Sequence, residues 1–65
     1  MQQGYEKDEE VDMKVKEGDY LCFKKFAIRA AKLNGGLWEY QLNDADDNKY
    51  DGGKWFPEKS LKRRE

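Results

Sequence analysis

The chain has 65 residues with one cysteine and no histidine, so it holds one small domain without an internal disulfide or the usual ligands of a structural zinc site. Charged residues make up 42% of the chain, yet the net charge is only −1, and a pI near 5.5 argues against a dedicated nucleic-acid-binding protein. We expect neither a metal nor another cofactor. The aromatic residues, 14% of the chain, are expected to supply much of the core.

The two ends of the chain are polar. Residues 1–10 (MQQGYEKDEE) offer only Tyr5 as an aromatic anchor, which predicts a disordered N-terminal arm. This segment lacks the apolar run of a secretory signal, and no stretch approaches the ~20 apolar residues of a membrane span. With the single thiol, these features favour an intracellular, reducing compartment. Residues 63–65 form a basic stub, and we expect the domain (residues 11–62) to belong to a larger protein.

A first strand is predicted over residues 11–16, because Val11, Met13 and Val15 alternate with charged residues. The next segment, residues 20–33, is open to two interpretations. Asp19 can act as a helix N-cap, and apolar residues follow at nearly helical spacing, which favours a basic amphipathic helix.

A second strand is the other interpretation of the same segment. Residues 26–31 also alternate, and the Asn34-Gly35 pair that follows is a strong signal for a hairpin between two strands. The periodicity of the residues alone leaves both interpretations open.

The second half of the chain predicts short strands joined by tight turns. Residues 37–43 (LWEYQLN) alternate clearly, and residues 44–48 (DADDN) have the composition of a turn. A last strand is expected over residues 54–56, with Trp55 entering the core, Phe56 on the opposite side and Pro57 ending the strand.

One helical or 3-10 turn is expected at residues 58–61, where it would return Leu61 to the core. Short strands with frequent turns favour a mainly β fold, a small SH3-like antiparallel barrel of about five strands. The alternative is an α+β fold in which a helix over residues 20–33 packs on a three-stranded sheet.

Three segments resemble a known family. Residues 16–23 (KEGDYLCF) look like the opening of chromo-barrel and Tudor domains, residues 29–32 (RAAK) resemble their second strand, and residues 55–62 (WFPEKSLK) resemble their ending. These domains form the Royal family of chromatin modules, which are built on SH3-like barrels. The resemblance implies that residues 26–33 form a strand and that the domain is a monomeric, nuclear module that recognises methylated lysine on histone tails.

The resemblance implies an aromatic cradle for a basic or methylated side chain, held by cation–π attraction. Lys24 and Arg29 stand where cage residues of the family are expected, so the candidate rings lie elsewhere, with acidic residues beside them. The candidate peptide-binding residues are Tyr20, Tyr50, Phe56, Asp46, Asp47 and Asp51. Trp38, Tyr40 and Trp55 are more simply explained as core residues, because so small a barrel needs them.

Nucleic-acid binding is an alternative function, through a basic strip formed by Lys24, Lys25, Arg29 and Lys32. The simpler interpretation of this strip is a solvated face. A third hypothesis is a structural domain that mediates assembly within a larger protein.

Catalysis is not expected. The chain has no histidine and no nucleophile beside a plausible base, and Cys22 in its apolar context is expected to be a buried structural thiol. The acidic segment from Asp44 resembles a calcium loop only in composition. An EF-hand needs Gly at its sixth and Glu at its twelfth position, where this chain has Lys49 and Trp55.

Overall fold

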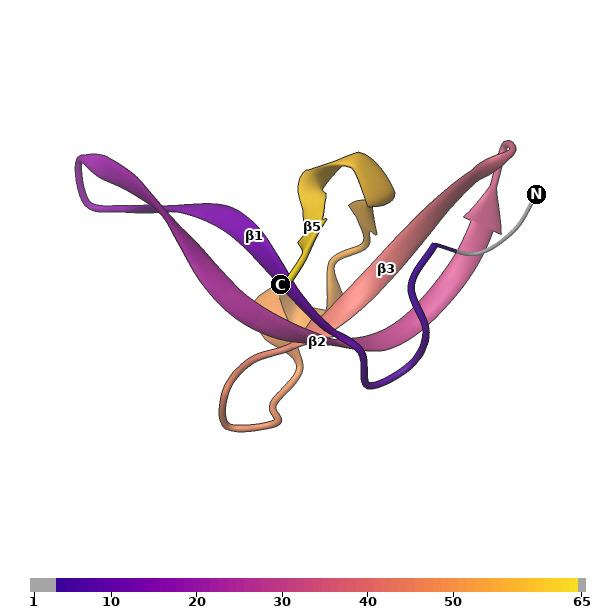
Figure 1. Ribbon diagram of the computed structural model, residues 1–65, viewed down its shortest axis with the longest axis horizontal. Coiled ribbons are helices and arrows are strands. Elements are labelled where there is room, and N and C mark those ends of the chain that lie inside the picture. The colour runs from indigo at the N-terminus through magenta and orange to yellow at the C-terminus, as the bar shows by residue number, and fades with distance from the viewer. Residues whose placement is uncertain (1–3, 65) are drawn as a thin grey trace.

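Short antiparallel strands account for most of the structure, a computed structural model that describes residues 4–64 (Figure 1). Within these residues the elements are β1 (Glu10–Glu17), β2 (Tyr20–Asn34), β3 (Leu37–Asn43), the 3-10 turn η1 (Tyr50–Gly53), β4 (Phe56–Pro57), the 3-10 turn η2 (Glu58–Ser60) and β5 (Leu61–Arg63). The strands form one sheet in the order β4-β3-β2-β1-β5, which curls into a half-barrel. The mainly β fold is therefore confirmed, and its form is compatible with an SH3-like barrel.

The long strand β2 belongs to two hairpins. Its first half pairs with β1, from Tyr20 opposite Glu17 to Ala27 opposite Glu10, and its second half pairs with β3. The alternative helix over residues 20–33 is therefore wrong. The hairpin signal prevails because Gly35 and Gly36, with φ angles of 60° and 81°, form the two-residue turn between β2 and β3.

A β-bulge at Arg29 changes which side chains of β2 face the core. Ile28 lies opposite Leu42, and Ala30 lies opposite Gln41, so Arg29 has no partner in β3. The extra residue shifts the alternation by one position and bends the strand. Before the bulge Ile28 faces the core, and after it Ala31 does.

The core lies inside the curl of the sheet, and alternation along the strands supplies it. Tyr40 is fully buried, as expected, while Trp38 is half-buried and packs against the core. The buried cluster consists of Tyr5, Val11, Met13, Phe26, Ile28, Tyr40, Leu42 and Leu61. The expected turn at η2 is confirmed, since it returns Leu61 to this cluster.

The last hairpin strand differs from the expectation. Strand β4 begins at Phe56, which lies opposite the buried Tyr40 and therefore faces the core, while Pro57 lies in the edge strand, where its missing N–H is tolerated. Trp55 lies outside the core cluster, with the Nζ of Lys32 4.4 Å from its ring centroid. Phe56 rather than Trp55 therefore faces the core, which is the reverse of the prediction. The strand also begins two residues later than expected.

The N-terminal segment is docked on the sheet from residue 4 onward. Tyr5 is buried and packs edge-to-face on Tyr40, with ring centroids 5.5 Å apart. The backbone N–H groups of Gly4 and Tyr5 donate to Tyr40 Oη at 3.2 and 3.3 Å, and Tyr40 Oη donates to Glu58 Oε1 at 2.7 Å. The disordered arm expected for residues 1–10 is therefore not what the structure shows from residue 4 onward, and residues 1–3 lie outside the described residues.

The C-terminal segment holds the docked N-terminal segment from the other side. The hydroxyl of Tyr5 donates to the backbone carbonyl of Leu61 at 3.3 Å, and Arg63 Nη2 donates to the carbonyl of Gly4 at 2.8 Å. Arg63 is the last residue of β5. Arg64 forms an ion pair with Asp12 at 2.6 Å. Both residues of the expected basic stub that are described here are held by contacts with the sheet, and residue 65 lies outside the described residues.

Tyr40→Phe tests whether the Tyr40 hydroxyl holds the N-terminal segment. The substitution removes the three hydrogen bonds of this hydroxyl, to Gly4, Tyr5 and Glu58, and should lower the free energy of unfolding by about 1–2 kcal/mol, measured by urea denaturation. Tyr20→Phe removes the hydroxyl of an exposed tyrosine and serves as the control. A loss below about 0.5 kcal/mol for Tyr40→Phe, the usual size of a surface effect, would contradict the role given to this hydroxyl.

Candidate functional site

Three rings from separate segments form a row. Tyr50 stands between Phe26 of β2 and Phe56 of β4, with ring centroids 4.5 and 5.9 Å away. Phe26 is buried, whereas Tyr50 and Phe56 are half-buried and pack against the core with part of their surface exposed. We call Phe26, Tyr50 and Phe56 the aromatic row.

The acidic loop between β3 and η1 is held in one conformation by its own hydrogen bonds. Asp44 Oδ1 accepts the backbone N–H groups of Asp46 and Asn48 at 2.9 and 3.0 Å, as expected for an Asp that begins a turn. The backbone N–H of Asp47 donates to the carbonyl of Asp44 at 3.0 Å. This loop confirms the predicted turn and places its acidic side chains beside β2.

A hollow of about 470 Å³ lies between this loop and the aromatic row. It is lined by Lys24, Lys25, Phe26, Asp44, Ala45, Asp46 and Tyr50. The structure therefore brings together two of the predicted peptide-binding residues, Tyr50 and Asp46, and places Phe56 beside Tyr50. We call this the acidic hollow.

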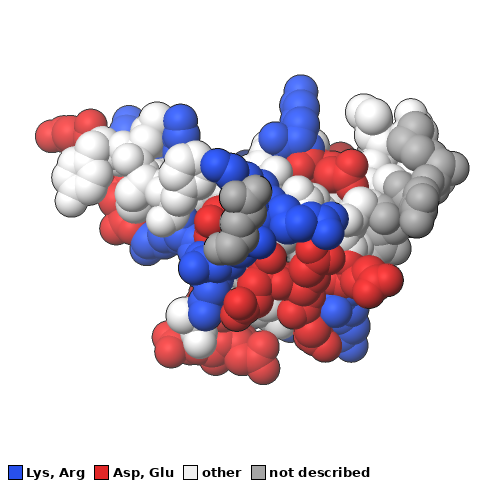
Figure 2. Space-filling model, viewed as in Figure 1, with Lys and Arg blue, Asp and Glu red and all other residues white. Residues whose placement is uncertain are grey.

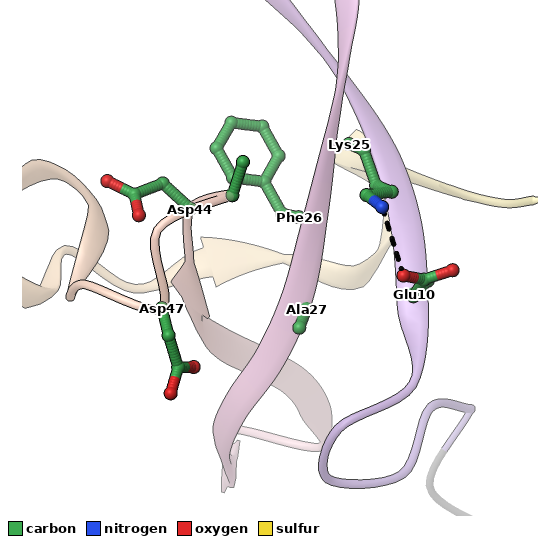
Figure 3. A pocket seen from close by; sticks show the side chains of 7 residues that line it. Glu10, Lys25, Phe26, Ala27, Asp44 and Asp47 are labelled. Atoms are coloured by element: carbon green, nitrogen blue, oxygen red, sulfur yellow. Dashed lines mark ion pairs between the residues drawn. The ribbon is translucent and has the colours of Figure 1, made fainter.

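A neighbouring hollow lies on another side of the same loop (Figure 3). Phe26 and Ala27 line it from β2, Asp44 and Asp47 line it from the loop, and Lys25 forms an ion pair with Glu10 at 3.2 Å along its far side. The side chains of Asp44 and Asp47 point in different directions from the loop.

Asp47 Oδ1 accepts a hydrogen bond from the side-chain amide of the buried Asn43 at 3.3 Å, so this carboxylate stabilises the loop and is turned toward Asn43.

Besides Phe56 and Asp47, two further predicted peptide-binding residues lie outside the acidic hollow, Tyr20 and Asp51. Tyr20 is 69% exposed at the tip of the first hairpin, and it lies six residues before Phe26 on β2, or about 20 Å along an extended strand. Asp51 is exposed in η1, where it adopts a left-handed conformation with φ of 51°. The sequence could not reveal that Tyr20 and Asp51 lie apart from the hollow, because the neighbours of Tyr50 depend on how η1 packs in the folded chain.

The four residues of the predicted basic strip have partners within the chain. Lys24 pairs with Glu17 at 2.6 Å, Lys25 with Glu10 at 3.2 Å and Lys32 with Glu39 at 3.8 Å, while Arg29 Nη1 donates to Asn43 Oδ1 at 3.0 Å. Lys24 and Lys25 are neighbours on a strand and point to opposite faces. These contacts favour the simpler interpretation of a solvated, ion-paired surface over a shared phosphate site.

Glu17, Cys22 and Lys24 form a small electrostatic cluster on the first hairpin. The hydrogen bond from Lys24 and the lysine charge lower the pKa of Glu17, and the same contact raises the pKa of Lys24. The thiol of Cys22 donates to Glu17 Oε1 at 3.6 Å. Removal of the thiol from water, followed by the negative charge of Glu17, raises the pKa of Cys22, so the reactive thiolate is disfavoured.

The residues that the structure describes contain no group of three or more Cys, Asp or Glu side chains arranged to hold a metal ion. No helix among them is long and apolar enough to cross a membrane. The chain matches no protein-family model, no curated protein and no solved structure. The candidate site therefore has to be judged on its own geometry.

Glu17→Gln tests the electrostatic control of Cys22. The wild-type thiol should react with iodoacetamide slowly, with an apparent pKa above the ordinary value of 9.0, because thiolate is the reactive form. Glu17→Gln removes the negative charge and should lower this apparent pKa and raise the rate at pH 8 (about one unit below that value). Glu39→Gln, a matched change on β3, should leave the rate unaltered. Equal rates of iodoacetamide reaction for the wild type and Glu17→Gln would contradict the effect of Glu17 on the pKa of Cys22.

Proposed function

We propose that the domain is a non-catalytic recognition module of Tudor or chromo-barrel type, which binds a basic peptide by holding one cationic side chain between Tyr50 and Asp46. The observation that supports this proposal best is the acidic hollow, where a half-buried ring and carboxylates line the same space. A ring attracts a cation through its electron-rich face, with about 0.5–2 kcal/mol, and a carboxylate adds charge complementarity.

Tyr50 is the ring that suits an external cation best. The outer surface of Phe56 already faces a cation of the chain, because Lys54 Nζ lies 5.5 Å from its ring centroid. Phe26 is buried beneath Tyr50. A cation entering the acidic hollow would therefore contact Tyr50 first.

Lys24 also lines the acidic hollow and would repel a cationic ligand if its charge were free. Its ion pair with Glu17 at 2.6 Å offsets that charge locally. The hollow can thus accept a cation, although it offers fewer rings than a complete aromatic cage.

The chemistry of the hollow favours a partially methylated lysine as the ligand. The Asp46 carboxylate can accept a hydrogen bond from an ammonium group that keeps at least one N–H. The single accessible ring of Tyr50 adds less affinity for each methyl group than a full aromatic cage would. A histone tail supplies such side chains in a basic context, so we propose a nuclear location and a monomeric domain that acts within a larger protein.

Peptide titration monitored by backbone amide shifts tests this function. Histone-tail peptides with unmodified, monomethylated, dimethylated and trimethylated lysine should shift residues of the acidic hollow, with the tightest binding for the mono- or dimethyl form. Tyr50→Ala should weaken binding by about 2- to 30-fold, the loss expected from one cation–π contact.

Asp46→Asn should weaken binding as well, and it leaves the exposed loop otherwise intact. Asp51→Asn removes a similar charge outside the hollow and serves as the matched control. If Asp46→Asn and Asp51→Asn bind the peptides as the wild type does, or if the shifts lie elsewhere on the domain, the proposed site is wrong.

A further inference from the structure

The first hairpin presents a second surface on the face turned away from the core. Residues directly opposite each other in antiparallel strands point to the same face, so Lys14 shares its face with Phe23, and Lys16 shares it with Leu21. Val15 and Met13, the intervening residues of β1, face the core instead. Lys62 of β5 extends this face, because it lies opposite Asp12, which has the same orientation as Lys14. We call Lys14, Lys16, Leu21, Phe23 and Lys62 the outer hairpin face.

Two large apolar side chains of the outer hairpin face are open to solvent. Phe23 is 57% exposed and Leu21 is 59% exposed, although most apolar residues of the neighbouring strands are buried. The hairpin projects from the half-barrel beyond the ends of the other strands (Figure 1). Packing within the domain therefore does not account for these two side chains.

The lysines of the outer hairpin face have no carboxylate partner. Among residues 4–64, Lys14, Lys16 and Lys62 take part in none of the five ion pairs, in contrast to Lys24, Lys25 and Lys32. The Nζ atoms of Lys14 and Lys62 lie 5.6 and 5.8 Å from the ring centroid of Phe23. Lysines without an ion-pair partner therefore lie beside the exposed ring of Phe23.

The arrangement has two parallel rows. The basic residues Lys14 and Lys16 follow β1, with Lys62 beside them on β5, and the apolar residues Leu21 and Phe23 follow β2. Both cations near the ring belong to the β1 side of Phe23. On its other side, β2 has no partner before Ala27, where its pairing with β3 begins, so the ring borders an open edge.

We propose that the outer hairpin face binds single-stranded nucleic acid. A single strand has charged phosphates along one side and flat bases along the other, which matches a row of lysines beside a row of apolar side chains. Exposed rings on sheets bind unpaired bases by stacking, while lysines contact the phosphates. A duplex would hide its bases from Phe23, and an acidic peptide would use the lysines but not the ring.

The acidic net charge of the chain does not prevent this binding, because the nearest carboxylates have basic partners: Asp12 pairs with Arg64 at 2.6 Å, and Glu17 pairs with Lys24 at 2.6 Å. Figure 2 shows blue and white atoms along the projecting hairpin with some red atoms at its tip, and a larger group of red atoms over the lower part of the molecule. At 0.1 M salt the effect of an exposed charge fades over about 10 Å, so the three lysines without an ion-pair partner outweigh the carboxylates that lie farther away.

A small site of this kind should bind weakly and lose affinity as salt rises. Three phosphate contacts to a single strand predict a slope of about −2 for the logarithm of affinity against the logarithm of salt concentration. Raising salt from about 50 to 200 mM should therefore weaken binding roughly 20-fold. Loss of one stacked base should weaken the affinity for the nucleic acid by about 5- to 150-fold.

The test is fluorescence anisotropy of the intact chain with a labelled oligothymidylate of about 12 nucleotides. Phe23→Ala should weaken binding at least about fivefold, and the triple variant Lys14→Gln, Lys16→Gln, Lys62→Gln should lose both affinity and the salt slope. All four side chains are exposed, so each variant is expected to fold, which circular dichroism checks.

A charge-matched variant separates this site from general electrostatic attraction. Lys24→Gln, Lys32→Gln, Lys54→Gln removes the same charge outside the outer hairpin face and should bind far better than the first triple variant. Equal losses in the two triple variants, or unchanged binding by Phe23→Ala, would overturn the proposal. Displacement of the oligonucleotide by poly-glutamate at the same concentration of charge would also overturn it, in favour of an acidic polypeptide. Asp46→Asn should leave this binding intact, so failure here is distinguishable from failure of the peptide site.

Discussion

The fold depends on one strand that serves two hairpins and shifts its alternation by one residue within the second. Strand β2 pairs with β1 up to Ala27 and with β3 from Ala27 onward, and the bulge at Arg29 lies within the second pairing. Without the extra residue, the alternation that buries Ile28 would turn Ala31 away from the core and expose the face that packs on Tyr40. The bulge keeps both halves of β2 facing the same interior while it bends the sheet, so one small core suffices for a chain of this size.

The curl of the sheet also decides where binding surfaces can form. It brings Phe26 of β2 against Tyr50 and leaves a hollow beside the acidic loop. The first half of β2 continues past the core, so the outward side chain of Phe23 remains exposed beside free lysines of β1. The Tyr40 hydroxyl ties residues 4 and 5 to the turn at Glu58, which joins the N-terminal segment to the far end of the chain. The two proposed sites therefore depend on one bent strand but differ in charge and in ligand.

The sequence predicted those parts of the structure in which local pattern and tertiary packing agree. Alternation located residues 37–43, and the turn that returns Leu61 to the core was also predicted. The helix–strand ambiguity over residues 20–33 had a physical cause, because β2 carries apolar side chains on both faces, as at Phe23 and Phe26, and the bulge at Arg29 interrupts its alternation. The docked Tyr5 was missed because its hydrogen-bond partners lie 35 and 56 residues away. Tyr50 and Asp46, both candidates from the sequence, line the same hollow, whereas the contact of Phe26 with Tyr50 was not expected.

The register of β2 is the most direct test of this account. Nuclear Overhauser contacts between backbone protons should place Ile28 opposite Leu42 and Ala30 opposite Gln41, while Arg29 shows no partner on β3. Residues 20–26 should show contacts between backbone protons with β1 and none with β3. A continuous register that gives Arg29 a partner, or contacts between residues three apart throughout 20–33 as in a helix, would contradict the account and remove the basis for both proposed surfaces.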